Sequence, residues 1–239
     1  MDVHLDDERE RGQDLPEGIV PLAPGGEASG PGATAPGRSL FRELVELAAI
    51  VLVVFIGLRM VLMPFEVDGA SMDPFLENGE HLFVNRLAYA DVNLTSWMND
   101  IPGVDVGRGA EITFGQPKRG DIVVLHPPVA SDSPYVKRVV ALPGETVSFH
   151  DGIVFVNGQP LVESYIEGAI TFCHNARWCS LTVPADSVYV LGDNREHSSD
   201  SRAFGPVRIS EIVGKVFFTN WPADRFGPVS SPDYDGVTP

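Results

Sequence analysis

The feature that most restricts how this chain can fold is an apolar run of 20 residues, from Leu44 to Met63. As a helix, a run of this length would be about 30 Å long, which matches the hydrocarbon core of a bilayer. Glu46 and Arg59 lie near its ends, where long side chains can reach the membrane interface. We therefore expect a transmembrane anchor over residues 41–63. A cleaved signal peptide and a buried core helix are the alternatives.

The segment before this run, residues 1–40, has the composition of a disordered tail. It is rich in Gly, Pro and acidic residues, so it buries too little apolar surface to offset its ordering entropy. Arg38 and Arg42 lie on the N-terminal side of the run, and the next basic residue beyond it is Arg86. By the positive-inside rule, the acidic tail is predicted to be cytoplasmic and residues 64–239 extracytoplasmic.

The part of the chain after the run is predicted to be mainly β. Short runs rich in β-branched residues, such as GDIVVLH and SVYVLGD, are separated by Gly, Pro, Asn and Asp. Asp151-Gly152 and Asn157-Gly158 lie between extended runs, which is a strong signal for β-hairpins. No long amphipathic helix is evident after Met63, so we expect one β-rich core.

Composition excludes several classes of protein. The chain has 17 Lys and Arg against 33 Asp and Glu, a formal net charge of −16. Nucleic-acid binding depends on Lys and Arg contacts to phosphate, so no nucleic-acid partner is expected. Two cysteines are too few for a four-cysteine zinc site, and neither a phosphate-binding loop nor an H-E-x-x-H motif occurs. No metal or cofactor is expected.

Lys137 is one of only three lysines, and it lies in the run YVKRVVA. Side chains alternate between the faces of a strand, so Lys137 shares a face with Tyr135 and Val139, and both faces are mostly apolar. Burial lowers the pKa of an amine and makes it a candidate general base. The plainer interpretation is a lysine that reaches solvent at a sheet edge.

Ser71 follows the apolar run and lies between small residues in the segment GASMDP. A serine nucleophile needs an adjacent base, and lysine can take the place of histidine. A turn serine before Asp73-Pro74 is the alternative. The polar segment Gly192–Arg202 is, by itself, typical of a loop whose side chains bond to its own backbone.

Together these segments resemble the sequence boxes of bacterial type I signal peptidases. The apolar run is followed in the family's order by SMDP at Ser71, RGDIVV at Arg119, KRVVALPGE at Lys137 and GDNREHSSDSR at Gly192. The resemblance extends to about Trp221. It implies coiled antiparallel sheets and a membrane-anchored serine endopeptidase with a Ser/Lys dyad. Such an enzyme removes signal peptides from exported preproteins after Ala-x-Ala-like sites.

The resemblance also implies roles for individual residues. Ser71 aligns with the nucleophile, Lys137 with the general base, and Ser198 with the serine that hydrogen-bonds and orients the lysine. Two ion pairs would support the site, namely Arg138 with Asp193 and Asp200 with Arg202. The residues expected to contact substrate are Val67, Asp68, Gly69, Met72, Leu76, Tyr135 and Val136.

Two positions depart from the family's usual pattern. Gly69 stands where some members carry a serine that is a second oxyanion donor, so the resemblance assigns no side chain to that role. Phe75 stands where Ser or Thr is usual, and its ring is a candidate for contact with lipid.

Cys173 and Cys179 are expected to form a disulfide, because their spacing closes a short loop and the predicted compartment is oxidising. A partial metal site that includes His174 is the alternative. The loop lies outside the sequence boxes, so its reduction is expected to lower stability more than activity.

Two other functions share some of these features. A self-cleaving Ser-Lys repressor would need a helix-turn-helix module and a basic face, in place of the acidic tail and apolar run. A non-catalytic extracellular β domain explains the anchor and the strands but not the serine, the lysine and the polar loop together. The expected partners are therefore signal peptides and the lipid bilayer. The expected location is the cytoplasmic membrane, with a single span.

Overall fold

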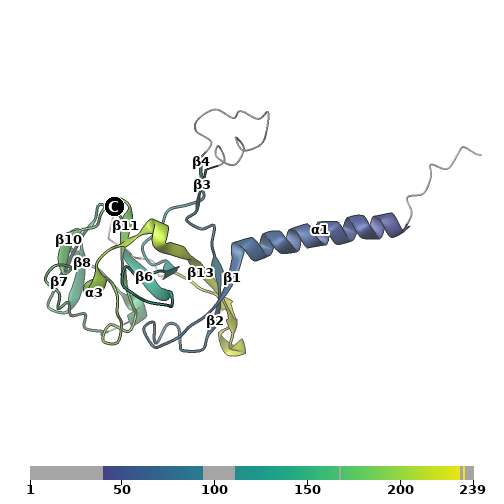
Figure 1. Cartoon of the computed structure of the whole chain (residues 1–239). Helices are drawn as coiled ribbons and strands as arrows, with labels where there is room; N and C mark the ends of the chain where they lie inside the picture. The colour runs from purple at the N-terminus through teal and green to yellow at the C-terminus, as the bar shows by residue number, and fades with distance from the viewer. Residues whose placement is uncertain (1–39, 94–110, 167, 232–233, 235–239) are drawn as a thin grey trace, which may run out of the picture. The chain divides into compact units, whose positions relative to one another are not determined.

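The computed structural model of the protein describes residues 40–93, 111–166, 168–231 and 234 (Figure 1). The predicted tail therefore lies almost wholly outside the described residues. Helix α1, Leu40–Val61, contains an 18-residue stretch with a mean hydropathy of 2.5 and is long and apolar enough to cross a membrane.

The apolar run does not stay helical to its end. The anchor was expected to reach Met63, but Leu62 and Met63 belong to strand β1, Leu62–Glu66. Pro64 disfavours a helical conformation in the residue before it. It is tolerated in β1 because β1 is an edge strand, paired antiparallel with β2 alone. Tertiary pairing and proline together shorten the helix.

The main sheet has eight strands, and every pairing in it is antiparallel. In spatial order its strands are β1 (Leu62–Glu66), β2 (His81–Asn85), β13 (Ile212–Trp221), β5 (Ile122–Leu125), β6 (Tyr135–Ala141), β11 (Ser187–Leu191) and β12 (Val207–Arg208), with β14 (Gly227–Pro228) paired to β13. Register shifts interrupt the pairing of β13 with β2 and β5, and of β11 with β6. Such bulges increase the local twist and curl the sheet.

A smaller sheet has four strands, in the order β10 (Ser180–Thr182), β7 (Thr146–His150), β8 (Ile153–Val156) and β9 (Gln159–Pro160). The turns that join β7 to β8 and β8 to β9 are the predicted hairpins. Asp151 and Gly152 have φ values of 51° and 78°, and Asn157 and Gly158 have values of 52° and 76°. These left-handed conformations favour Asn, Asp and Gly, and both hairpin predictions are confirmed.

The remaining elements are short. Strands β3 (Asp91–Asn93) and β4 (Glu111–Thr113) pair with each other. Among the described residues after β1, the one α-helix is the four-residue α3 (Ser201–Phe204), beside the 3₁₀ turns Ser164–Ile166, Ile209–Glu211 and Ala223–Arg225. The expectation of a mainly β fold is therefore confirmed.

Strand β6 occupies the middle of the main sheet, between β5 and β11. Figure 1 shows β7, β8 and β10 on one side of it and β1 and β2 on the other. Every residue of β6 after Tyr135 is buried. Its valines and alanine belong to three apolar clusters, to which β2, β5, β8 and β11 also contribute. A polar side chain on β6 is therefore held by core packing on either face.

Candidate active site

Lys137 lies within β6 and is only 3% exposed. Its register partner on β5 is Val123. Its Nζ atom lies 2.7 Å from Ser71 Oγ and 2.7 Å from the carbonyl oxygen of Val136. The fold thus brings together two residues that are 66 positions apart in the chain. Lys137 is buried because β6 is a central strand of the sheet. The alternative of a lysine that reaches solvent at a sheet edge is therefore wrong.

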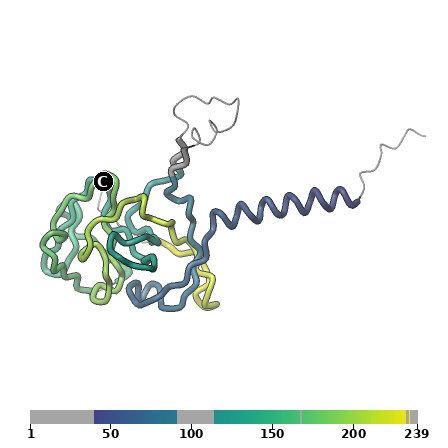
Figure 2. The backbone as a smooth tube through the Cα atoms, viewed as in Figure 1, coloured from purple at the N-terminus to yellow at the C-terminus, as the bar shows by residue number. Residues whose placement is uncertain are grey.

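The loop after β1 presents Ser71, and backbone contacts fix its shape. The N–H of Gly69 donates to Asn78 Oδ1 at 2.7 Å, and Gly69 has a φ of 99°, a conformation that favours glycine. The Ser71 carbonyl accepts from the N–H of Asn194 at 3.1 Å. Figure 2 shows that the Ser71 loop, β6 and the segment after β11 lie side by side although they are distant in sequence.

The environment of Lys137 favours its neutral form. Burial of the ammonium group lowers the pKa of Lys137 from 10.5 to about 8. The negative charges of Asp200 and Asp193 oppose this shift but do not cancel it. A serine hydroxyl 2.7 Å from an amine of lowered pKa is the arrangement that nucleophilic catalysis requires.

Arg138, the next residue, points to the opposite face of β6 and is fully buried. It donates two hydrogen bonds to the Asp193 carboxylate, at 2.8 and 2.6 Å, and a third to the Gly120 carbonyl at 3.1 Å. Burial alone would lower the pKa of Arg138, but the hydrogen bonds and charge of Asp193 raise it. This ion pair, one of the two expected, ties the segment after β11 to β6.

The second expected ion pair holds the polar loop. Arg202 donates to both carboxylate oxygens of Asp200, at 2.8 and 2.7 Å. Asp200 also caps the N-terminus of α3 and accepts from the N–H of Gly192 at 3.0 Å. Its buried carboxylate therefore fixes both ends of the loop that runs between residues 192 and 202.

Ser198 differs from the expectation. Its Oγ is buried but has no hydrogen-bond partner in the described part of the chain, whereas it was expected to bond Lys137. Lys137 instead donates to Ser71 and to the Val136 carbonyl. Ser198 is nevertheless close to the nucleophile. Its Oγ and the Ser71 carbonyl oxygen both lie within 2.5 Å of the position that a Cβ on Gly192 would occupy.

A cavity of about 370 Å³, here called the dyad cavity, opens at Ser71 and Lys137. Four residues expected to contact substrate also line it, namely Val67, Asp68, Tyr135 and Val136. The family resemblance did not point to the other lining residues, which are Phe65, Glu66, Ser133, Pro134 and Ser199. Most of these adjoin the expected residues along the chain, so extending each predicted segment by two residues would have found them.

Met72 and Leu76 are placed differently from the expectation. They are 0% and 2% exposed and pack in the apolar cluster that also contains Leu82 and Val84. They support the Ser71 loop from the core side and do not line the dyad cavity. Gly69 is exposed but does not line that cavity either. Proximity to Ser71 in sequence did not predict which residues line the dyad cavity, because this loop turns back on the core.

Phe75 was a candidate for contact with lipid, but its ring instead faces Arg138. The guanidinium carbon of Arg138 lies 4.6 Å from the centre of the Phe75 ring and 4.0 Å from that of Tyr165. An aromatic face attracts a cation, so the two rings stabilise the buried guanidinium. The sequence carried no signal for the contact with Tyr165.

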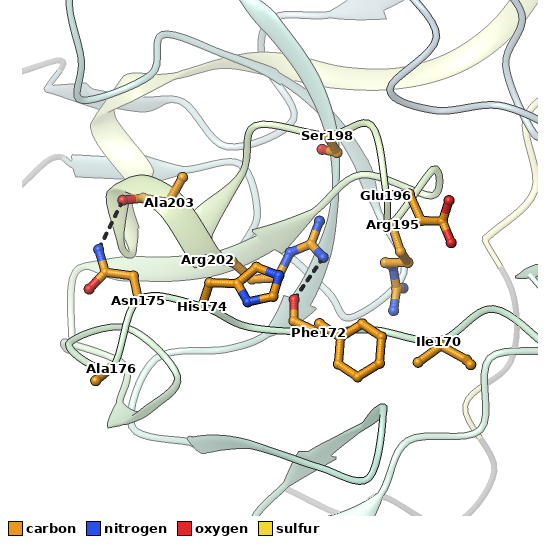
Figure 3. A pocket seen from close by; sticks show the side chains of 10 residues that line it. All are labelled: Ile170, Phe172, His174, Asn175, Ala176, Arg195, Glu196, Ser198, Arg202 and Ala203. Atoms are coloured by element: carbon orange, nitrogen blue, oxygen red, sulfur yellow. Dashed lines mark hydrogen bonds between the residues drawn. The ribbon is translucent and has the colours of Figure 1, made fainter.

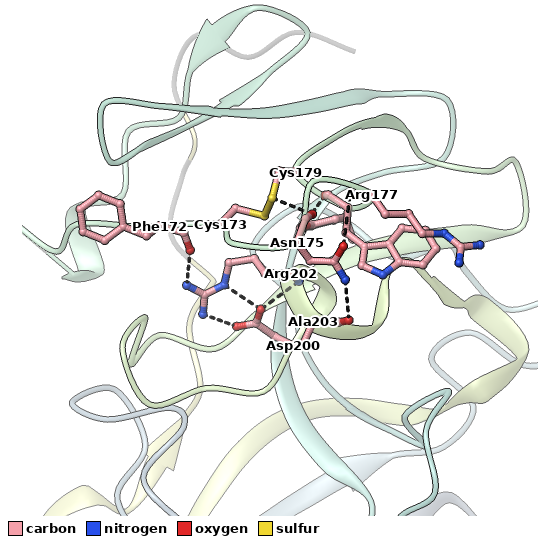
Figure 4. Close-up of a disulfide and its surroundings, with 10 residues drawn as sticks. Phe172, Cys173, Asn175, Arg177, Cys179, Asp200, Arg202 and Ala203 are labelled. Carbon is pink, nitrogen blue, oxygen red and sulfur yellow. Dashed lines mark hydrogen bonds and ion pairs between the residues drawn. A yellow bond between two sulfur atoms is a disulfide. The ribbon is translucent and has the colours of Figure 1, made fainter.

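Cys173 and Cys179 form a disulfide, as expected, so neither thiolate is available to a metal (Figure 4). The loop is not isolated from the site. The Phe172 carbonyl accepts from Arg202 at 3.2 Å, and Asn175 donates to the Ala203 carbonyl at 3.5 Å. Loss of the disulfide should therefore disturb the Asp200–Arg202 segment as well as stability.

Comparisons with known proteins show the family of the chain. Residues 41–221 match the family model for signal peptidases, peptidase S26. The chain is 33% identical to signal peptidase I of Leptolyngbya laminosa, over 86% of this chain and 90% of that protein. It is 32% identical to signal peptidase IB of Staphylococcus aureus, over 79% of this chain and 93% of that protein.

A solved structure is also similar in sequence. A signal peptidase I from Enterococcus faecalis is 34% identical, with a TM-score of 0.38, over 42% of this chain and 96% of that chain. The fold and the sequence matches together define a class, the serine peptidases built on antiparallel β-sheets. Within that class, the chain belongs to the signal peptidase family, peptidase S26.

Proposed function

We propose that the protein is a single-pass membrane endopeptidase that removes N-terminal signal peptides from exported preproteins. The observation that carries the proposal is the 2.7 Å contact between Lys137 Nζ and Ser71 Oγ in a chain of this family. Ser71 is the nucleophile and Lys137 is the general base.

The reaction begins when the neutral Lys137 amine takes the proton of the Ser71 hydroxyl. Oγ attacks the carbonyl carbon of the scissile peptide bond, and the Ser71 N–H stabilises the oxyanion, a contact worth about 3–4 kcal/mol. The C–N bond then breaks, and the Lys137 ammonium gives its proton to the leaving amine. The signal peptide remains as an ester on Ser71. Lys137, neutral again, activates the water that hydrolyses this ester.

The lowered pKa of Lys137 makes this cycle possible near neutral pH. With a pKa of about 8, about one molecule in ten holds a neutral Lys137 at pH 7. At the ordinary pKa of 10.5 this fraction would be several hundred times smaller. The hydrogen bond to the Val136 carbonyl orients the amine toward Ser71.

The dyad cavity supports a preference for small side chains before the cleaved bond. Val67, Val136 and Tyr135 line the cavity beside Ser71. Walls of this kind select Ala-x-Ala-like sites by excluding larger residues more than by attracting alanine.

The proposed placement of the chain follows from its apolar helix and its charges. Residues 1–39 form the cytoplasmic tail, helix α1 (Leu40–Val61) the anchor, and residues 62–239 the extracytoplasmic catalytic domain. The disulfide between Cys173 and Cys179 supports an oxidising location for this domain.

The test is cleavage of a purified preprotein by the full chain in detergent, with the product identified by mass spectrometry. Ser71→Ala and Lys137→Ala should each lose at least about 10⁴-fold in kcat, and the double variant should lose little more, because the two residues act as a unit. Lys118→Ala is the matched control, since Lys118 is exposed. Turnover near that of the wild type in Ser71→Ala or Lys137→Ala would refute the mechanism.

A further inference from the structure

A second cavity has a volume of about 830 Å³ (Figure 3). We call it the disulfide-loop cavity. Its lining includes Ile170, Phe172, His174, Asn175, Ser198 and Arg202. The two cavities meet at consecutive residues, since Ser199 lines the dyad cavity and Ser198 lines the disulfide-loop cavity. Its volume is within the range of about 300–1,000 Å³ that is usual for ligand sites.

The wall formed by residues 170–175 is held in place from several directions. The N–H of Thr171 donates to the Gly152 carbonyl at 2.8 Å, and its hydroxyl accepts from Arg195 at 2.7 Å. The Phe172 carbonyl accepts from Arg202 at 3.2 Å. A wall fixed in this way costs little entropy when a ligand binds.

One wall of the cavity is apolar, whereas most of the remaining lining residues are polar or charged. Ile170 and Phe172 are 55% and 59% exposed, and Figure 3 shows them on one wall, opposite the loop that carries Arg195 and Ser198. The cations of the opposite side are already neutralised. Arg195 pairs with Glu163 and Arg202 pairs with Asp200.

A further cavity, of about 430 Å³, connects this surface to the nucleophile segment. It shares Ile170, Arg195 and Glu196 with the disulfide-loop cavity and reaches Asp73, two residues after Ser71. The surface therefore extends from the Ser71 segment to Phe172. The dyad cavity, which is lined by Ser199 and not by Ser198, is assigned to the residues before the scissile bond.

We propose that the disulfide-loop cavity binds the part of the preprotein that directly follows the scissile bond, with Ile170 and Phe172 in contact with an apolar side chain of that segment. The proposal rests on the proposed function and names the part of the same substrate that this cavity holds. A chain that crosses Ser71 after leaving the dyad cavity meets this surface next. The protein thus contacts substrate residues on both sides of the cleaved bond.

The test uses two preproteins that share the signal peptide and the cleavage site. One carries Leu and the other Ser at the positions that follow the scissile bond. The wild-type chain should cleave the Leu substrate with a kcat/KM about 10-fold higher, mainly through KM, because burial of a Leu side chain is favourable in substrate and transition state alike. Phe172→Ala should reduce this ratio to about 2, and Ile170→Ala should reduce it in the same direction.

Phe114→Ala is the matched control, since Phe114 is 52% exposed and lies outside both cavities. It should leave the ratio unchanged. A wild-type ratio near one, or an unchanged ratio in both Phe172→Ala and Ile170→Ala, overturns the proposal. Circular dichroism shows whether Phe172→Ala and Ile170→Ala are folded. If one of them is not, the other still tests the proposal. Failure of the wild-type chain to cleave either preprotein refutes the proposed function instead.

Discussion

The two faces of β6 hold adjacent buried cations in opposite surroundings. On one face, Lys137 contacts neutral oxygens of Ser71 and Val136, and burial lowers its pKa to about 8. On the other face, Arg138 is bound to the Asp193 carboxylate and lies between two aromatic rings, and its pKa is raised.

The difference shows how one strand can supply both a general base and an ion pair that stabilises the site. A buried cation with neutral partners loses its proton easily, which a general base must do. A buried cation with a bidentate carboxylate keeps its charge and fixes the carboxylate's own segment in place. Arg138 thereby holds the segment that contacts the Ser71 carbonyl through Asn194.

The largest expected effect comes from replacing each cation with methionine. Arg138→Met should lower the free energy of unfolding by about 3–5 kcal/mol, because Asp193 is left buried without its partner. Lys137→Met should be at least as stable as the wild type at pH 7, because a buried ammonium opposes folding there. Urea denaturation at pH 7 measures both. Equal losses in the two variants would contradict the comparison.

A second effect concerns the proton that Lys137 receives. Its ammonium has three N–H groups, and the Val136 carbonyl and Ser71 accept two of them. Ser198 Oγ is buried near the Ser71 carbonyl oxygen and has no hydrogen-bond partner among the described residues, and we propose it as the acceptor of the third. Ser198→Ala should lower kcat about 10- to 1,000-fold by misplacing the base.

Loss of this acceptor should also shift the pH profile of Ser198→Ala to lower pH, since the ammonium is less well stabilised. His197→Ala is the control, because His197 is exposed and its side chain contacts only Asn194 among the described residues. Preprotein cleavage by both variants from pH 6 to 10 makes the measurement. The reverse ordering would indicate a histidine base.

The pH dependence of the wild type tests the lowered pKa directly. Cleavage needs neutral Lys137, so kcat/KM should fall about tenfold per pH unit below about pH 8 and level off above it. Lys137 also affects the free energy of unfolding between about pH 8 and pH 10.5. There the unfolded chain binds the proton that the folded chain has lost, so stability rises with pH. Lys137→Met should abolish that rise, and a rate that increases toward pH 5 would exclude the lysine base.

The smallest expected effect comes from the aromatic support of Arg138. Phe75→Leu keeps an apolar side chain but removes the ring face that lies 4.6 Å from the guanidinium. It should lower the free energy of unfolding by about 0.5–1 kcal/mol. In the Arg138→Met variant, which has no guanidinium, Phe75→Leu should lower the free energy of unfolding by less. An equal cost in both backgrounds, measured by urea denaturation, would show that Phe75 acts through packing alone.

Local sequence was sufficient for several parts of the fold. The Asp151-Gly152 and Asn157-Gly158 turns follow from the backbone conformations that these residues adopt easily. The apolar run predicted a helix, although pairing of β1 with β2 moved its end to Val61. The alternation along YVKRVVA predicted that Lys137 and Arg138 face opposite sides and that Lys137 has apolar neighbours, with a lysine at a sheet edge as the alternative. The structure buries both residues.

Other parts were decided only by contacts between distant segments. How far the pKa of Lys137 is lowered depends on its burial and on which groups face it, and its neighbours come from other segments of the chain. The paired Asp193 lies 55 residues from Arg138, and Phe75 and Tyr165 approach Arg138 from two further loops. Met72 and Leu76 are in the core because their loop folds back, which strand alternation does not describe.

The sequence by itself thus determined the apolar helix, the mainly β fold and the residues that carry the family's motifs, because these depend on local patterns and composition. Tertiary structure decided the meeting of Ser71 with Lys137, the cavities beside them and the ionisation of the lysine. These depend on burial and on neighbours from other strands, and burial sets the electrostatic free energy of a charged side chain.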